Sequence, residues 1–419
     1  MRINLSIFAI IIISCTQATI NNNKDDFQPN DIIKNYNAVE VGLDILFQEK
    51  INIINRKKIG LVTNHSGVDK YGKPNYLKFI DQKNIDLKII FSPEHGLFGE
   101  GAAGQKLEYN QIENMPKIVS LYGKNKKPNL KDLKEIDLII YDVQDVGARF
   151  YTYITTLGYI MEAAAKTNIK VIILDRPNPI NGNIIEGPVL NIQNQSFVGY
   201  YPIPIRYGLT MGELAKMIIG EKWIKQSPDL LVVPMKNWSR KMWYDETGLN
   251  WTKPSPNIPD INTALIYPGM CLLEATNINE GRGTEKPFKR FGAPWINNRT
   301  LTAKLNEKNL PGVEFKAVTY IPKDISGVAI NPKYKNQICN GVEIIVKDRN
   351  RYQSVKTGIA IISQIASDYP NLFEISEKRM KKLWGINDLS IFKNINNNAI
   401  DRSSIKDFLA LSKKYYIYN

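Results

Sequence analysis

The sequence predicts a doubly wound α/β domain built on a parallel sheet, followed by a second, smaller α+β domain. Three observations indicate this fold class. Short, β-branched apolar runs alternate with helical patterns as far as residue 220, which is typical of right-handed strand–helix–strand units. Four of these runs end in a polar cluster followed by glycine or proline, and the carboxyl ends of strands are where open sheets bind ligands. The alternation stops near residues 221–229, so we expect domains at 38–225 and 226–419.

The first domain opens with a helix over Leu43–Ile54, whose apolar residues fall on one face. Strands are expected at the short apolar runs Lys58–Val62, Leu87–Phe91, Lys117–Leu121, Asp137–Tyr141 and Lys170–Leu174. Pro93 cannot extend the second of them, because proline has no N–H for the ladder. Helices are expected at Asn75–Lys83, Leu130–Glu135, Arg149–Ala165 and Met211–Gly220. Thr210 and Glu213 predict a capping box at the start of the last helix.

The second domain is expected to begin with a strand at Leu230–Pro234, followed by an ordered loop over Trp238–Pro259 that is rich in aromatic residues and proline. Its later strands are expected at Val313–Tyr320 and Gly341–Val346, and its helices at Thr357–Ser367 and Ser404–Lys413. This mixture, without the regular alternation of the first half, indicates an α+β domain that closes over the first.

Composition and the N-terminus indicate an exported protein. The net charge of +14 comes from scattered lysines rather than a basic stripe, so no nucleic-acid partner is expected and an anionic envelope is favoured. Residues 5–13 are apolar but too few to span a bilayer, which needs about 20. Ile12-Ile13-Ser14-Cys15 has the form of a bacterial lipobox. We therefore expect a signal peptide over 1–15, a lipid anchor on Cys15 and a linker over 16–37. The protein would then be a periplasmic or outer-membrane lipoprotein of the cell envelope, or secreted. The alternative is a plain cleaved signal with an incidental cysteine.

Metals and cofactors are not expected. Cys271 and Cys339 could pair in an exported chain, and no CxxC or Cys/His spacing indicates a zinc site. The glycines at 99–104 match GxGxxG, but they lie well beyond the preceding strand and no good helix follows them. A dinucleotide-binding turn needs both features, so this stretch is interpreted as a loop.

Glu94 is the leading catalytic candidate. It lies in SPEHG, directly after the second predicted strand. A carboxyl at a sheet edge beside proline and phenylalanine can be shielded from water, as a general acid or base requires; the alternative is a glutamate in a loop salt bridge. His95 could tune Glu94, hold a substrate, or bond to its own loop. Asn64 and His65 occupy the same place after the first strand.

A dense polar cluster follows the fourth predicted strand. Asp142 or Asp145 could be a second carboxylate or could orient an amide, and Asp145 could equally cap the next helix or pair with Arg149. Tyr151 could offer a ring and a hydroxyl to a sugar, or it could belong to the core. The other polar candidates at these strand ends are Gln144 and Asn178, the second of which could simply form a turn.

In the second half, Glu274 and Arg282 are candidates for the other side of a site. Glycines on both sides of Arg282 let the backbone approach a ligand and leave the guanidinium for a carboxylate contact. The alternative is a turn with a surface arginine.

Long, ordered motifs resemble the exo-β-N-acetylmuramidase family of peptidoglycan hydrolases, the NamZ type. They include GLVTNHSGVD, FSPEHGLFGE, YDVQDVGARFYTYI, LDRPNPING and EATNINEGRGTEKPF, and the likeness runs from Val39 to the C-terminus. The resemblance implies a Rossmann-like domain, a smaller domain and an active site in the cleft between them. It also implies the release of N-acetylmuramic acid from the non-reducing ends of wall fragments.

Carried onto this chain, the resemblance makes Glu94 the prime catalytic residue, with Asp142 and Asp145 beside it. The substrate-binding candidates are Asn64, His65, His95, Gln144, Arg149, Tyr151, Asn178, Glu274 and Arg282. The chain departs from the family at Ala275, where glycine is frequent, and at His65, where glutamine is frequent.

The chemistry of glycoside hydrolysis agrees with these candidates. It needs a proton donor at the glycosidic oxygen and a second group on the other face, which could be a carboxylate or the 2-acetamido group of the sugar. The lactyl carboxylate of N-acetylmuramic acid calls for an arginine, Arg149 or Arg282. The competing hypothesis is a non-catalytic lipoprotein that binds muropeptides or sugars in the same cleft.

Overall fold

The computed structural model describes residues 38–393 and 403–419, apart from positions 103, 106, 108, 110, 111 and 124. The expected signal peptide over 1–15, the lipobox at Cys15 and the linker over 16–37 lie outside the described residues. No helix within the described ranges is long and apolar enough to cross a membrane.

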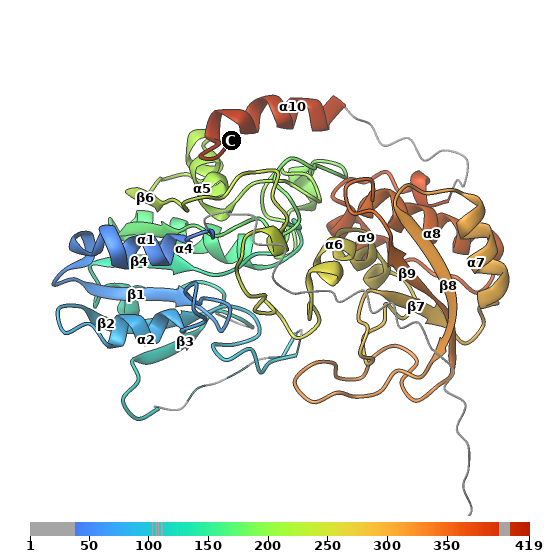
Figure 1. Ribbon diagram of the computed structural model, residues 1–419, viewed down its shortest axis with the longest axis horizontal. Coiled ribbons are helices and arrows are strands. Elements are labelled where there is room, and N and C mark those ends of the chain that lie inside the picture. The colour runs from blue at the N-terminus through green and yellow to red at the C-terminus, as the bar shows by residue number, and fades with distance from the viewer. Residues whose placement is uncertain are drawn as a thin grey trace, which may run out of the picture. The chain divides into compact units, whose positions relative to one another are not determined.

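A parallel sheet of six strands lies on one side of the fold (Figure 1). Its strands are β1 (Lys58–Thr63), β2 (Asp86–Ser92), β3 (Lys117–Ser120), β4 (Leu138–Asp142), β5 (Lys170–Leu174) and β6 (Leu230–Val233). Their order is β3-β2-β1-β4-β5-β6, and every neighbouring pair is parallel. This confirms the predicted doubly wound, Rossmann-like topology. The order reverses between β1 and β4, and ligands bind in such folds beyond the carboxyl ends of the strands at this point.

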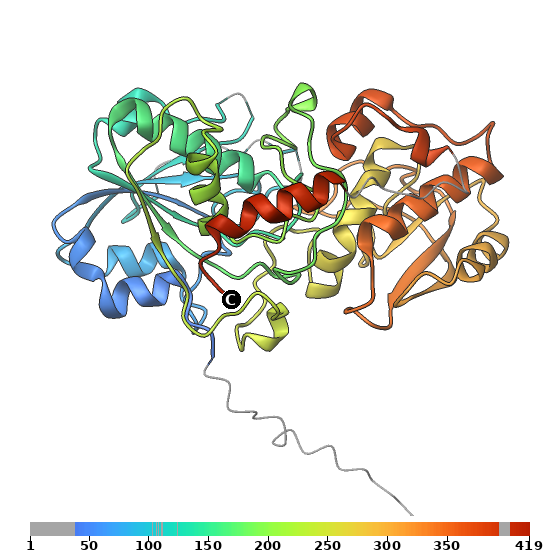
Figure 2. The ribbon, with the colours of Figure 1, turned by 90° about the horizontal axis from the view of Figure 1, so that it is seen from above.

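Helices cover both faces of this sheet (Figure 2). They are α1 (Gly42–Glu49), α2 (Asn75–Ile80), α3 (Leu130–Leu133), α4 (Tyr153–Thr167) and α5 (Met211–Gly220). Because successive side chains of a strand point to opposite faces, Ile90 and Ile140 pack with α1 and α2, whereas Phe91 and Ile139 pack with α4 and α5. Both faces are therefore apolar, as a buried parallel sheet requires.

The helix ends predicted from local sequence signals agree only in part with the structure. The capping box of α5 is confirmed, because the Thr210 hydroxyl accepts from the Glu213 N–H and the Glu213 carboxylate accepts from the Thr210 N–H. The predicted helix over Leu43–Ile54 consists of α1 and a 3₁₀ turn, η1 (Ile51–Ile54). The helix predicted from Arg149 begins only at Tyr153, and the Arg149 N–H bonds to the carbonyl of Ile205.

The smaller domain contains an antiparallel sheet in the order β7-β9-β8. Its strands are β7 (Arg290–Ala293), β8 (Val313–Tyr320) and β9 (Cys339–Val346), and its helices are α6 (Ile261–Met270), α7 (Asn298–Glu307), α8 (Ser354–Asp368) and α9 (Glu377–Trp384). The sequence predicted β8, β9 and α8, but α6, α7, α9 and β7 were not predicted. Cys271 and Cys339 are both buried and free, so the pairing that the sequence left open does not form.

The predicted domain boundary after residue 225 needs correction. Strand β6 pairs with β5 and forms an edge of the six-stranded sheet, so the first domain extends beyond this point. The last helix, α10 (Ser403–Ser412), lies beside α5 in Figures 1 and 2. After it, Tyr415 donates to Glu221 at 2.5 Å and Tyr418 donates to Asp175 at 2.7 Å, so the C-terminus also packs on the sheet domain.

Candidate active site

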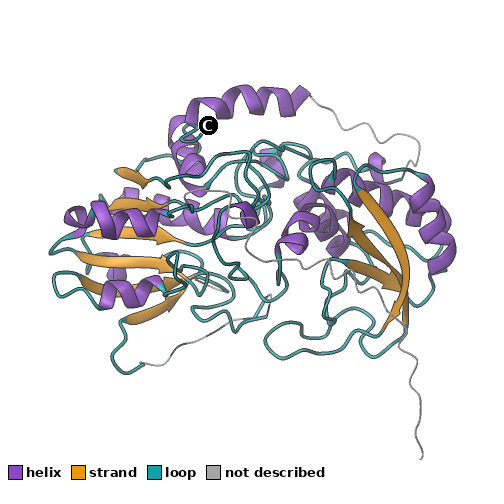
Figure 3. Ribbon diagram, viewed as in Figure 1, coloured by secondary structure: helices purple, strands orange, loops and turns teal. Residues whose placement is uncertain are grey.

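A cavity of about 400 Å³ is lined by residues of both domains. On the sheet side, its walls are the loop after β2, the residues just before α4 and segments 197–198 and 255–258. On the other side they are η4 (Cys271–Ala275), residues from 280 to 288, segment 328–333 and α9. Loops occupy most of the region between the two sheets (Figure 3). The cavity therefore lies beyond the strand ends, where the sequence predicted a site.

Glu94 lines this cavity, as predicted, and is 8% exposed. Its Oε2 accepts from the Thr152 hydroxyl at 2.8 Å, and its Oε1 accepts from the N–H of Gly104 at 3.1 Å. The Tyr122 hydroxyl lies next to the same carboxylate; burial and the Glu94 charge together raise the pKa of Tyr122. The carboxyl group is thus oriented by neutral donors and largely shielded from water.

His95 also lines the cavity, but its ring is held by its own loop. The Nδ1 atom lies 2.9 Å from the carbonyl oxygen of Gly101, and the residue has a φ of +75°, which is uncommon for residues other than glycine. Burial lowers the pKa of His95, in spite of the opposing effect of Glu94. The imidazole is therefore neutral at neutral pH and shapes the loop that carries Glu94.

Ion pairs form the opposite wall. Glu274 accepts from Arg282 (Nη2–Oε1, 2.8 Å) and from Arg379 (Nη2–Oε2, 2.6 Å). Glu280 pairs with Arg282 (Nε–Oε1, 3.2 Å) and with Lys333 (Nζ–Oε2, 3.0 Å). Burial disfavours the charge of Glu274, but the two arginines outweigh this effect and lower its pKa. Glu274 and Arg282 therefore line the site as predicted, within a larger network.

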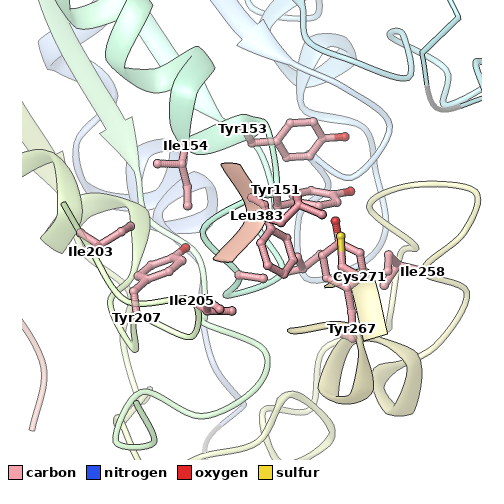
Figure 4. Close-up of a cluster of buried hydrophobic side chains, with 14 of the residues drawn as sticks. Tyr151, Tyr153, Ile154, Ile203, Ile205, Tyr207, Ile258, Tyr267, Cys271 and Leu383 are labelled. Carbon is pink, nitrogen blue, oxygen red and sulfur yellow. The ribbon is translucent and has the colours of Figure 1, made fainter. Parts of the chain in front are cut away.

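Aromatic rings form the base of the cavity. Tyr151 packs edge-to-face on Tyr153 (4.7 Å between centroids) and Tyr267 (6.1 Å), and Figure 4 shows Tyr151, Tyr267 and Cys271 side by side. Phe288 packs on Tyr267 at 4.9 Å. Tyr151 thus belongs both to the core and to the cavity lining, which combines the two alternatives left open by the sequence.

Asp142 does not reach the cavity. Its carboxylate is fully buried and bonds to Arg176 (Nε–Oδ1, 2.5 Å; Nη2–Oδ2, 3.0 Å) and to Asn75 (Nδ2–Oδ2, 2.7 Å). A carboxylate saturated in this way holds the loops after β4 and β5 together. The structure therefore places Asp142, which was predicted as a possible second catalytic carboxylate, outside the cavity lining.

Asp145 is also absent from the cavity lining. Its Oδ2 accepts from the Tyr207 hydroxyl and from the N–H of Gly147, so it neither caps α4 nor pairs with Arg149. Burial raises the pKa of Asp145 to about 6, against the effect of these hydrogen bonds. Through these two bonds Asp145 stabilises the turn that follows β4.

Arg149 is the largest departure from the predicted site. Its guanidinium is buried and donates to four backbone carbonyl oxygens: Pro188 (2.7 Å), Ile203 (2.9 Å), Leu383 (2.7 Å) and Trp384 (2.9 Å). Burial lowers its pKa to about 9, so it remains charged at neutral pH. Arg149 therefore joins the sheet domain to the end of α9 and cannot reach a ligand.

The remaining predicted side chains hold loops instead of lining the cavity. They bond to Tyr153 in the case of Asn64 (2.6 Å), to the Lys253 carbonyl in the case of His65 (2.7 Å), to the Asp145 and Pro177 carbonyls in the case of Gln144 (both 2.8 Å), and to the Leu209 carbonyl in the case of Asn178 (3.0 Å). Polar residues after parallel strands can contact a ligand or stabilise the loop, because the chain must turn sharply there. Asn178 Oδ1 also accepts from the N–H of Ile180 at 3.2 Å, which is the local contact that the turn-forming alternative expects.

Several lining residues were not predicted from the sequence. They are Tyr122, Thr152, Ser255, Asn257, Glu280, Lys333 and Arg379. Thr152 and Glu280 lie inside motifs that were already singled out, so their position was a usable signal. Arg379 lies on a helix that was not predicted and carried no such signal.

The fold and the site define a class: a two-domain α/β protein whose cavity holds one carboxyl group opposite a network of ion pairs. A family model described as the N-terminal part of exo-β-N-acetylmuramidase NamZ matches residues 59–262, and one for the C-terminal part matches residues 265–418. The chain belongs to this family of glycosidases. The models divide the chain near residue 263, after β6, rather than at 225.

Known relatives agree in sequence and in fold. The chain is 41% identical over 389 residues, covering 91% of each protein, to the peptidoglycan β-N-acetylmuramidase NamZ of Bacillus subtilis strain 168. Two crystal structures of DUF1343 family proteins from Bacteroides fragilis NCTC 9343 are similar, with TM-scores of 0.83 and 0.71 at 33% and 29% identity. Each comparison covers 91% of this chain and 99% of the other.

Proposed function

We propose that this protein is an exo-acting glycosidase that releases N-acetylmuramic acid from the non-reducing ends of peptidoglycan fragments, with Glu94 as the general acid. One observation carries the role of Glu94. Three glutamates line the cavity within the described ranges, and Glu94 is the one without an ion pair. The hydrogen-bond partners of Glu94 are the neutral Thr152 hydroxyl and Gly104 N–H, whereas Glu274 is kept ionised by its arginines.

The proposed reaction begins with transfer of the Glu94 proton to the glycosidic oxygen as the bond from C1 to that oxygen breaks. Thr152 and Gly104 hold the carboxyl group in place during this step. Asp142 and Asp145 do not line the cavity, so neither is assigned as the second group. The opposite face of the sugar is left to water or to the 2-acetamido oxygen of the substrate. Water finally adds its hydroxyl oxygen to C1 and gives its proton to the Glu94 carboxylate, which restores the acid.

The Glu94→Gln variant tests this role with a chromogenic glycoside of N-acetylmuramic acid. General acid catalysis contributes about 100- to 10,000-fold, so kcat should fall by that factor while binding of free N-acetylmuramic acid, measured by calorimetry, is kept. Glu113→Gln is the matched control, since Glu113 is exposed and does not line the cavity. Full turnover by Glu94→Gln would remove Glu94 from the mechanism. Binding without turnover by the unmodified protein would favour the sugar-binding hypothesis.

We also propose that a lipid on Cys15 anchors the protein in the cell envelope, where peptidoglycan turnover supplies its substrate. The support is the positive Met1-Arg2 start, the short apolar run and the lipobox. Metabolic labelling with an alkynyl fatty acid should mark the full chain and should fail to mark Cys15→Ala. Equal labelling of both would contradict the anchor.

A further inference from the structure

The ion-pair wall of the cavity carries an excess positive charge. It contains three cations, Arg282, Lys333 and Arg379, and two carboxylates, Glu274 and Glu280. At neutral pH the sum is one positive charge. A cavity wall with one uncompensated cation suits a ligand that brings one negative charge.

Two of the three cations have little capacity left. An ammonium has three N–H donors, and those of Lys333 go to the carbonyls of Leu273 (3.0 Å) and Ile278 (2.8 Å) and to Glu280 (3.0 Å). Arg282 lies between Glu274 and Glu280, and its guanidinium carbon is 5.0 Å from the centre of the Phe288 ring. The charges of Lys333 and Arg282 are thus already compensated by groups of the protein itself.

Arg379 differs from these two cations in its exposure to solvent and in the number of its hydrogen bonds. Its side chain is 56% exposed, compared with 20% for Arg282, and its bond within the described chain is a single one, from Nη2 to Glu274 at 2.6 Å. A guanidinium has five donors in a fork that fits a carboxylate. Glu274 is shared with Arg282, so it neutralises Arg379 only in part.

The backbone that carries Arg379 is fixed relative to the opposite wall. On α9, Met380, Leu383 and Trp384 are buried, and Leu383 lines the cavity one turn after Arg379. The end of this helix accepts two hydrogen bonds from Arg149, whose neighbours in sequence carry the contacts to Glu94. The backbone position of Arg379 relative to the wall that carries Glu94 is thereby set by the fold.

We infer that Arg379 is the specificity-determining residue that receives the lactyl carboxylate of the sugar, in place of the predicted Arg149 and Arg282. This inference rests on the proposed function. The lactyl ether is the group that distinguishes N-acetylmuramic acid from N-acetylglucosamine, so Arg379 selects between these two sugars. Neither covalent chemistry nor a cofactor is involved.

The experiment compares the full chain with Arg379→Gln, Arg379→Lys and Lys378→Gln on three chromogenic substrates. These are the glycosides of N-acetylmuramic acid, of its lactyl amide and of N-acetylglucosamine. Lys378 is the matched control, because it is exposed on the same helix and does not line the cavity. Glutamine keeps a good helix former at the position, and Arg379 is exposed, so the variant should fold.

We expect Arg379→Gln to raise KM for the acidic substrate about 10- to 100-fold, the value of a charge-assisted hydrogen bond, with a much smaller change in kcat. The same variant should leave KM for the amide and for the N-acetylglucosamine glycoside unchanged. Arg379→Lys should fall in between, because it keeps the charge and loses the fork. Lys378→Gln should match the unmodified chain.

An equal effect of Arg379→Gln on the acid and the amide would overturn the inference, as would no effect on either. If the unmodified chain cleaves none of the substrates, the proposed function fails instead. The inference is then decided by calorimetry with free N-acetylmuramic acid and N-acetylglucosamine. Weaker binding of the acid alone by Arg379→Gln supports it, and unchanged binding refutes it.

Discussion

Replacing Arg149 by methionine should destabilise the protein and weaken substrate binding together. Four backbone carbonyl oxygens would lose their donor, and an unmade bond to a buried acceptor costs about 1 kcal/mol or more. Methionine also removes the cost of burying a cation without a carboxylate, a cost that the lowered pKa of Arg149 reflects. The balance should lie near 3–5 kcal/mol, the range observed when buried charged interactions are broken.

Two assays measure this prediction. Differential scanning fluorimetry should show a fall in Tm of about 6–10 °C, since a protein of this size loses roughly 2 °C per kcal/mol. Because α9 carries Arg379, KM for an N-acetylmuramic acid glycoside should rise more than KM for the N-acetylglucosamine compound. The matched control is Arg299→Met, an exposed arginine whose loss should change stability by less than about 0.5 kcal/mol. A Tm within 2 °C of the unmodified chain would refute the reasoning.

Two further predictions concern Asp145 and Gly358. The pKa of Asp145 is raised to about 6 in the folded protein from about 3.9 when unfolded, so its ionised form costs stability above pH 6 and protonation restores that stability as the pH falls. Asp145→Asn should therefore raise the free energy of unfolding relative to the unmodified chain at pH 8, by at most about 3 kcal/mol, and this advantage should disappear by pH 4. Measuring Tm of both proteins at the two pH values checks the sign. A larger advantage at pH 4 than at pH 8 would contradict the prediction. A Cβ at Gly358 would lie 2.4 Å from the carbonyl oxygen of Gly269, so Gly358→Ala should separate α6 from α8 and cost about 1–3 kcal/mol or more in urea unfolding. Gly199→Ala is its control, since its nearest neighbour would lie at 3.5 Å, and an equal loss in both would argue against close helix packing as the cause.

Elements supported by strong local patterns were predictable. The five strands of the first half are short apolar, β-branched runs, four of which have polar ends, and α5 carries its own capping box, so each could be recognised from a few residues. Helix α6 could not, because it contains Pro268 and Gly269, both of which disfavour helices. Packing against α8 stabilises it instead, and such tertiary contacts are not visible in a local window. β6 was predicted as a strand but assigned to the wrong domain, because its partner β5 lies far back in the sequence.

The site was predictable where one short motif places a side chain. Glu94 follows β2 directly, so the position of the strand end is enough to place it in the cavity. Asp142 follows β4 in the same way, yet Arg176, from the loop after β5, takes up its charge. A polar residue at a strand end thus either contacts a ligand or stabilises a loop. Which of these it does depends on partners that sequence spacing does not reveal.

Arg149 and Arg379 show how charge is divided between structure and recognition. Both are arginines, and the sequence favoured Arg149 because it follows a conspicuous polar cluster. Arg149 and Leu383 are 234 residues apart in the chain. Only the folded chain reveals that the guanidinium of Arg149 donates its hydrogen bonds to backbone carbonyls. That contact in turn holds α9, so that the exposed Arg379 on the same helix remains available. In the proposed mechanism the two domains therefore have different roles: the sheet domain supplies the proton from Glu94 and the structural arginine Arg149, and the smaller domain supplies the charge of Arg379 that distinguishes one sugar from another.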